Sequence, residues 1–470
     1  MSINRARGDR LALHRSVVAA AIVMSALTLL LNGTAAAAVA APRVEKALEQ
    51  VVATDASTFR LNGISFQQDA ITSLNGWQYV AFYSDVAGRP GVRHLNIARR
   101  KMDVFVYGGW QRLEFTDYEQ TLDDSHNVVS MGISPRDGTI HLAFDMHACH
   151  PGNTLHYRRS VPGLATDPQD VAWQASSFGA VTNRLGNVTM PAVGTFCGAN
   201  SPSLSPITYP RFVATPQGDV LLSMRVGVPG NGHEHLWSYA NGTWTQLGRY
   251  IDGSGANPYL NGLDYDRNGR LHVTWIWREE PALTTSHDIN YIYSDDNGRT
   301  WKNNSGAAAG TSGSAPVTKS SVGPPAVPIA QNSGLLNQEA QAVDAAGRVH
   351  LMMRDNISGS LRWVHWVRGV TDGRWNRRVT PFNPGGRAKI VAARKAGTPY
   401  DDVYALLPGT GIASASGEDS WRNWTVVDTD YARFGSEAVY DRRRLADSGL
   451  LSLMGQTGTT LVTQEWRLAR

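Results

Sequence analysis

The stretch Asp137-Gly-Thr-Ile-His-Leu-Ala-Phe144 joins a tight-turn signal to an alternating apolar strand. An Asp-Gly or Asn-Gly pair favours a two-residue hairpin turn, and the alternation that follows places one side of the strand in a core. This pattern recurs along the chain, and we count seven copies. The other six lie at residues 75–82, 217–224, 268–275, 346–353, 402–406 and 448–453.

The copies are spaced by about 57 residues, a period typical of β-propeller blades built from four strands. We therefore predict an all-β fold, a seven-bladed β-propeller of four-stranded antiparallel blades. The alternative is two β-sandwiches joined by the Gly-, Ala-, Ser- and Pro-rich residues 305–328. The propeller is favoured because the repeat resumes in phase at Gln338, and because closure by the chain termini leaves no open sheet edge.

Two local patterns support this fold. Ser294-Asp-Asp-Asn-Gly-Arg-Thr-Trp301 matches the S-x-D-x-G-x-T-W turn of sialidase-like propellers, in which the Asp holds a β-turn and the Trp packs between strands. His141, His272 and His350 share one position in the repeat. We interpret these three histidines as structural residues that bond a neighbouring strand.

The N-terminal residues resemble an export signal rather than a part of the fold. Four arginines precede an apolar run at 17–31, and small residues follow at 35–41. This order predicts a secretory signal peptide at 1–41 and one propeller domain at 42–470. No later stretch could form a transmembrane helix, so we expect a secreted protein with no membrane association after signal removal. Cys149 and Cys197 favour one disulfide, with metal ligation beside nearby histidines as the alternative.

The charge balance limits the class of partner. The formal net charge is +4, from 44 basic and 40 acidic residues, and long Lys/Arg runs are absent. Nucleic acid is therefore not expected as a partner, whereas a polyanionic substrate is compatible with a mildly basic chain. We expect a monomer.

Polar side chains stand at strand ends in the second and third repeats. His126 precedes one apolar strand, and His147 follows the next strand, 21 residues later. In the third repeat, Tyr209 lies in Ile207-Thr-Tyr-Pro-Arg-Phe212, and Arg225 ends the second strand. Propellers bind ligands where the inner strands of several blades converge. We therefore predict that His126, His147, Tyr209 and Arg225 face one site.

The stretches DSHN, DGTIHLAFDMH, TYPRF, GDVLLSMR and LNGLDYDRNGRLHVTWIWRE resemble the BNR-repeat seven-bladed propeller polysaccharide lyases. That family includes ulvan lyases and rhamnosyl-α-1,4-glucuronate lyases. Its members carry two histidines, then a tyrosine, then an arginine at the spacing that separates Tyr209 from Arg225 here. The resemblance implies that His126, His147, Tyr209 and Arg225 are catalytic, and that Arg387 lines the site.

The resemblance also implies a reaction. A lyase of this family would cleave the bond to O4 of a glucuronate linked to rhamnose, in ulvan or arabinogalactan/gum-type glycans. β-Elimination removes the C5 proton and expels O4, which leaves a 4,5-unsaturated uronate. Arg225 suits the uronate carboxylate because its guanidinium is planar and always charged. We assign His147 and Tyr209 to proton transfer and His126 to the carboxylate or O4, and leave open which residue takes the C5 proton.

Asn127 and Trp277 complete the predicted substrate-binding residues, the latter as a ring that faces the cavity and stacks on a sugar. The chemistry requires no cofactor, because Arg225 and Arg387 supply positive charge, although the family allows a structural calcium or zinc ion. Two other functions stay open. One is a rhamnosidase-like glycoside hydrolase, disfavoured because these stretches hold no evident pair of catalytic carboxylates. The other is a non-catalytic carbohydrate-binding propeller.

Overall fold

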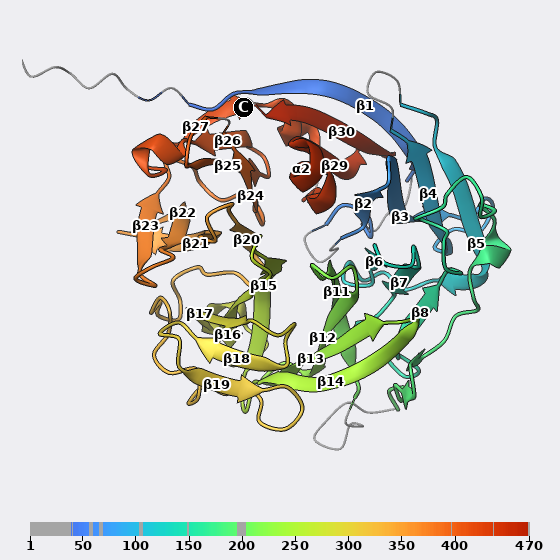
Figure 1. The fold of residues 1–470 in the computed structure, drawn as a ribbon, viewed down its shortest axis with the longest axis horizontal. Helices are drawn as coiled ribbons and strands as arrows, with labels where there is room; N and C mark the ends of the chain where they lie inside the picture. The colour runs from blue at the N-terminus through green and yellow to red at the C-terminus, as the bar shows by residue number, and fades with distance from the viewer. Residues whose placement is uncertain are drawn as a thin grey trace, which may run out of the picture. The chain divides into compact units, whose positions relative to one another are not determined.

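The turn-strand repeats form seven antiparallel sheets arranged around a common axis (Figure 1). This computed structural model describes residues 39, 41–55, 60–64, 69–102, 107–147, 150–194, 204–395, 397–435 and 437–468. Residues Ala41–Arg470 form one compact unit. The prediction of a seven-bladed β-propeller is confirmed, and the two-sandwich alternative is wrong.

Each blade begins with its innermost strand. Blade one contains β2 (Ile71–Leu74), β3 (Trp77–Asp85), β4 (Arg93–Lys101) and β5 (Gln111–Gln120). Blade two contains β6 (Val129–Ile133), β7 (Ile140–Phe144) and β8 (His156–Arg159). Blade three contains β11 (Ile207–Ala214), β12 (Val220–Val228), β13 (Asn231–Ala240) and β14 (Thr243–Asp252). Blade four contains β15 (Asn257–Tyr265), β16 (Leu271–Arg278), β17 (Ser286–Ser294), β18 (Thr300–Asn303) and β19 (Ala308–Thr311).

The second half of the ring follows the same order. Blade five contains β20 (Ala340–Val343), β21 (Val349–Ile357), β22 (Ser360–Arg368) and β23 (Trp375–Val379). Blade six contains β24 (Lys389–Arg394), β25 (Asp401–Leu407), β26 (Gly411–Ala415) and β27 (Thr425–Asp428). Blade seven contains β28 (Val439–Tyr440), β29 (Leu450–Thr457), β30 (Thr460–Leu468) and β1 (Val44–Thr54).

Short elements connect the blades. The α-helix α2 (Arg442–Ser448) links β28 to β29, and a small hairpin of β9 (Arg184–Leu185) and β10 (Val188–Thr189) follows blade two. The 3₁₀ turns are η1 (Ala175–Ser177), η2 (Leu283–Thr285), η3 (Gly417–Asp419) and η4 (Asp430–Arg433). In the described part of the chain, no helix is long and apolar enough to cross a membrane.

Two blades depart from the predicted four strands. Blade two has three regular strands, and isolated bridges from Tyr157 to Thr182 and from Ser160 to Phe178 continue its outer edge. Blade four gains a fifth strand, β19, within residues 305–328, which we predicted to be only a loop between blades. The other five blades have four strands each in the described residues.

The apolar core is divided among the blade interfaces. The described residues contain seven clusters of buried apolar side chains, and each cluster lies mainly between two neighbouring blades. Because both faces of a blade meet a neighbour, strands such as β3 and β6 are buried along almost their whole length. The ring closes where β1 pairs antiparallel with β30, from Val44–Leu468 to Thr54–Thr460 (Figure 1). The predicted closure by the chain termini is therefore confirmed.

The three repeat histidines bond the next strand, as predicted. The Nδ1 atom of His141 lies 2.7 Å from the hydroxyl of Tyr157, and that of His272 lies 2.8 Å from the hydroxyl of Tyr291. In blade five the partner is another histidine, because Nδ1 of His350 lies 3.0 Å from Nε2 of His365. The side chains therefore tie the second strand of each of these blades to the third.

The S-x-D-x-G-x-T-W stretch forms the predicted turn between β17 and β18. The Asp296 carboxylate accepts the backbone N–H groups of Arg299 at 3.1 Å and Thr300 at 2.9 Å. Trp301 is buried and stacks on Tyr250 of blade three, with ring centres 5.1 Å apart. The predicted signal peptide (1–41) and both cysteines, Cys149 and Cys197, lie outside the described residues, apart from residues 39 and 41.

Candidate active site

Blades two and three bring the four predicted catalytic side chains together where their inner strands begin. The imidazole rings of His126 and His147 stack with centres 3.9 Å apart and planes 12° apart. The Tyr209 ring lies 6.0 Å from the first and 6.3 Å from the second. The Arg225 guanidinium carbon lies 4.9 Å from the centre of the Tyr209 ring. The predicted constellation is thus one compact group.

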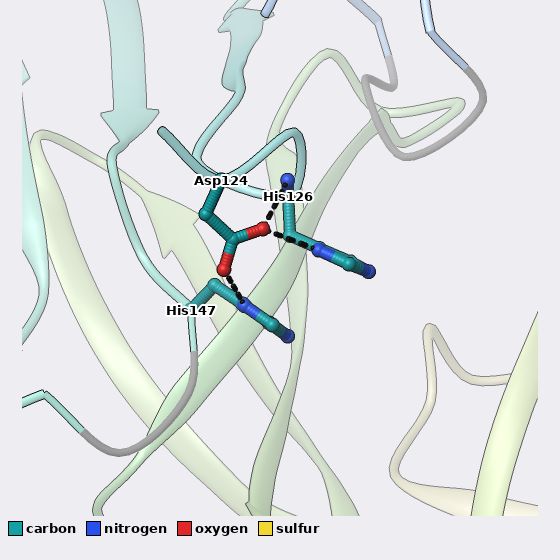
Figure 2. Close-up of side chains that lie close together, drawn as sticks. All are labelled: Asp124, His126 and His147. Carbon is teal, nitrogen blue, oxygen red and sulfur yellow. Dashed lines mark hydrogen bonds and ion pairs between the residues drawn. The ribbon is translucent and has the colours of Figure 1, made fainter. Parts of the chain in front are cut away.

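Asp124 connects the two histidines (Figure 2). Its Oδ1 lies 2.6 Å from Nδ1 of His126 and also accepts the backbone N–H of His126 at 3.0 Å. Its Oδ2 is hydrogen-bonded to Nδ1 of His147. Burial opposes the charge of Asp124, but the hydrogen bonds from both histidines outweigh it and hold the pKa of this carboxyl well below its usual range. Asp124 is therefore an ionised acceptor.

An irregular backbone directs Tyr209 toward the histidines. The pairing of β11 with β12 shifts register between Thr208 and Arg211, and Tyr209 has a φ of 57°. A bulky residue in the left-handed region is strained, by about 1–3 kcal/mol, and persists only where its surroundings hold it. The hydroxyl of Ser130 in β6 provides such support, because it donates to the carbonyl of Pro210 at 2.8 Å.

Arg225 is a buried cation without an ion-pair partner among the described residues. It is 3% exposed and donates to the hydroxyl of Tyr259 at 3.0 Å and to that of Thr208 at 3.3 Å. Tyr259, Tyr209 and Glu234 favour its charge, and burial raises the pKa of Glu234 to about 7. A buried charge is costly unless it is paired. The site therefore favours an added anion beside Arg225.

The surroundings keep His147 and Tyr209 neutral near neutral pH. Burial lowers the pKa of His147, and the nearby charges of His126 and Arg225 lower it too. The hydrogen bond to Asp124 raises this pKa but does not outweigh them. Burial raises the pKa of Tyr209 to about 12, although Arg225 opposes this. A neutral imidazole can accept a proton and a neutral phenol can donate one. The site thus holds a base and an acid side by side.

Of the predicted substrate-binding residues, Arg387 lies near the catalytic group, whereas Asn127 makes no side-chain hydrogen bond among the described residues. Arg387 donates to the backbone carbonyl of Asn337 at 2.8 Å and lies 4.0 Å from the Glu437 carboxylate, and its charge acts on Tyr209. Asn127 is 1% exposed, and its amide atoms have no hydrogen-bond partner among the described residues. Its predicted role in binding stays a prediction.

The prediction that Trp277 faces an open cavity is wrong. The ring is 3% exposed, belongs to an apolar cluster between blades three and four, and meets Trp275 edge-to-face at 5.6 Å. Residues two apart on a strand point to the same face. Both tryptophans therefore enter the core, and Trp277 has no free face for a sugar.

Two residues of the site were missed in the sequence. Asp124 stands two residues before His126, and that spacing suits a carboxylate that bonds a nearby backbone N–H. Tyr259 opens β15 in blade four and lies 6.2 Å from Tyr209, ring centre to ring centre. No local motif marks Tyr259, since its contact with Arg225 depends on the packing of two blades.

A cavity of about 1070 Å³ lies where the inner strands end, away from this group. Its lining includes Ala214, Asp264 and Arg394, but none of the predicted catalytic residues. At this end Arg442 of α2 forms ion pairs with Asp264 and, at 3.1 Å, with Asp69.

The ligating atoms of Asp124, His126 and His147 lie within 4.8 Å of one another, close enough to share a metal ion. In the arrangement described, however, both Nδ1 atoms are bonded to the carboxylate.

Residues 77–382, more than half of the chain, match the BNR repeat-containing family. A long-isoform ulvan lyase from Alteromonas sp. is 27% identical over 281 residues, which are 52% of this chain and 27% of the relative. This chain thus spans about a quarter of the length of that relative.

Among solved structures, the polysaccharide lyase Uly1 superposes with a TM-score of 0.62 and 18% identity, covering 91% of this chain and 99% of that one. A PL25 ulvan lyase bound to -[GlcA(1-4)Rha3S]- superposes with a TM-score of 0.56 and 12% identity, covering 89% of this chain and 95% of that one. These superpositions show a shared fold.

Proposed function

Because the chain belongs to the BNR repeat-containing family, we propose that it is a polysaccharide lyase that acts by β-elimination on a glucuronate-containing glycan. One observation carries this proposal: a buried, unpaired Arg225 lies beside a neutral imidazole and a neutral phenol. Elimination next to a carboxylate needs this combination of a cation, a base and an acid. The ulvan lyase names of the relatives agree with it.

The reaction follows from these side chains. Arg225 binds the uronate carboxylate and stabilises the charge that develops on it as the C5–H bond breaks. We assign the base to His147, whose Nε2 accepts the C5 proton because its Nδ1 proton is bonded to Asp124. The C–H electron pair forms the C4–C5 double bond, and the C4–O4 bond breaks. Tyr209 gives its proton to O4. Solvent then carries the proton that His147 took from C5 to the Tyr209 phenolate, which restores both side chains.

The proposed substrate is a polymer in which glucuronate is linked to rhamnose, such as ulvan or a rhamnose-bearing arabinogalactan or gum. Incubation with a panel of these polymers tests this choice, with ultraviolet absorbance of the unsaturated uronate as the readout. A polymer of glucuronate without rhamnose is the control. Turnover of the control at the same rate would refute the rhamnose requirement.

No metal or organic cofactor is needed for this chemistry, since Arg225 supplies the cation. Activity should therefore survive prior treatment with EDTA, and a loss that added calcium or zinc restores would refute this. We also propose that the protein is exported and works outside the cell as a monomer. Sequencing the N-terminus of protein recovered from culture medium tests export, and light scattering tests the oligomeric state.

A glycoside hydrolase is less well supported. Retaining and inverting hydrolases need two carboxyl groups, one of them protonated. The carboxylate in contact with the histidine pair is Asp124, which both imidazoles hold in its ionised form. Asp124 therefore cannot act as the general acid of that mechanism.

A further inference from the structure

Asp124 does more than anchor a loop, because its two oxygens face two different ring nitrogens. Oδ1 receives both the backbone N–H and the Nδ1 of His126, and Oδ2 receives the Nδ1 of His147. Figure 2 shows the two rings parallel, with their Nε2 atoms on the side away from the carboxylate. A single carboxylate thereby orients both rings.

An ionised carboxylate can only accept hydrogen bonds. Each Nδ1 atom that faces Asp124 must therefore carry the proton. For neutral His147 this leaves Nε2 as a bare acceptor, and no described residue is hydrogen-bonded to that nitrogen. The ring is 19% exposed, so Nε2 can meet a ligand. Nε2 of His147 stays an acceptor only while the Asp124 carboxylate bonded to Nδ1 is ionised.

We propose that Asp124 is a positioning residue that fixes the Nδ1–H tautomer of His147 and so makes Nε2 the proton acceptor. This inference rests on the proposed lyase function for its catalytic consequence, but the tautomer itself is a property of the free protein. Nothing in the sequence pattern of two histidines, one tyrosine and one arginine includes this carboxylate.

Asp124→Asn gives a specific test. The Asn amide has one oxygen, which accepts, and one NH₂ group, which only donates, and the backbone N–H of His126 requires the oxygen at the Oδ1 position. The amide NH₂ then faces His147, whose Nδ1 must accept, so its proton moves to Nε2. The substitution preserves shape and most hydrogen bonds but inverts one tautomer. In a Ser-His-Asp triad, a comparable change lowers kcat about 10⁴-fold.

The first measurement uses no substrate. ¹⁵N-histidine-labelled full-length protein is examined at neutral pH, with His147→Gln to assign the resonances. We expect Nε2 of His147 to be unprotonated in the parent protein and in Asp123→Asn, which alters an exposed neighbouring carboxylate. It should carry a proton in Asp124→Asn. An unchanged tautomer in Asp124→Asn would overturn the proposal.

The second measurement is turnover of a rhamnose-glucuronate polymer. We expect kcat to fall about 10²–10⁴-fold in Asp124→Asn with KM little changed, because substrate contacts remain while the base is blocked. Asp124→Glu keeps the carboxylate and should retain the tautomer and more of the activity. Equal losses in both variants, with the tautomer unchanged, would reduce Asp124 to a loop anchor. An inverted tautomer in a protein without lyase activity would instead support the positioning role and refute the proposed function.

Discussion

Arg225→Gln removes the buried cation of the site and leaves a shorter, neutral side chain that can donate hydrogen bonds. The structure predicts separate effects on function and stability. Arg225 is 3% exposed and has no ion-pair partner among the described residues, and its charge is compensated by hydrogen bonds to the hydroxyls of Tyr259 and Thr208. Its removal should change the melting temperature little, because the cost of burying the charge and the loss of these hydrogen bonds offset one another.

Activity should fall steeply. Two unit charges about 4 Å apart interact by about 4 kcal/mol at an effective dielectric of about 20. Each 1.36 kcal/mol of transition-state stabilisation corresponds to about tenfold in rate. Loss of the Arg225–carboxylate interaction should therefore lower kcat/KM about 10³-fold. Arg225→Lys keeps a charge but loses the planar guanidinium that reaches Tyr259 and Thr208. Its kcat/KM should lie between those of the parent protein and Arg225→Gln.

The assay pairs initial rates of ultraviolet absorbance with thermal unfolding of the same samples. Arg249→Gln is the matched control, because Arg249 lies in the same blade, on its outer strand, and is already paired with Asp252 at 2.9 Å. The control should keep its activity. A lowered melting temperature of Arg225→Gln with full activity would show that Arg225 is structural, and the reasoning would be refuted.

Tyr209→Phe should lower kcat about 10²–10⁴-fold with an intact fold, as measured by initial rates and circular dichroism, because the phenol proton is the proposed acid; retained activity would remove that role. Ser130→Ala leaves the carbonyl of Pro210 without its donor, and should cost about 1 kcal/mol of stability and about tenfold in kcat. Ser134→Ala, directly after the other end of β6, should leave kcat unchanged. Burial lowers the pKa of His365 well below its usual range, so the unfolded chain binds more protons below about pH 6.5 and stability falls as pH drops through that value. His365→Tyr, the residue that blades two and four carry at this position, should lose less melting temperature between about pH 7 and about pH 5; an equal loss would contradict this assignment.

The sequence predicted the blades well because their signals are local. Each turn and the alternating strand after it lie within about eight residues, as at 137–144, and the histidine at 141 bonds the adjacent strand. The extra strand β19 was missed, since its Ala- and Gly-rich residues resemble a loop. Trp277 was misplaced because we assigned it and Trp275 to different faces, although residues two apart on a strand point to the same face.

The site was predicted as a set of residues but not as an arrangement. Sequence and family resemblance identified both histidines, Tyr209 and Arg225, and the structure brings these side chains together. The left-handed φ of Tyr209, the double hydrogen bond of Asp124 and the contact from Tyr259 could not be read from the sequence. Each depends on side-chain direction or on packing between blades, which a linear pattern does not specify.

The central claim is that this site performs elimination rather than hydrolysis. The most direct test is the mass and absorbance of oligosaccharides released from a rhamnose-glucuronate polymer. Elimination predicts products that absorb in the ultraviolet and whose uronate end is lighter by one water than the hydrolytic product, with both signals lost in His147→Gln. Products of the hydrolytic mass without this absorbance would contradict the account.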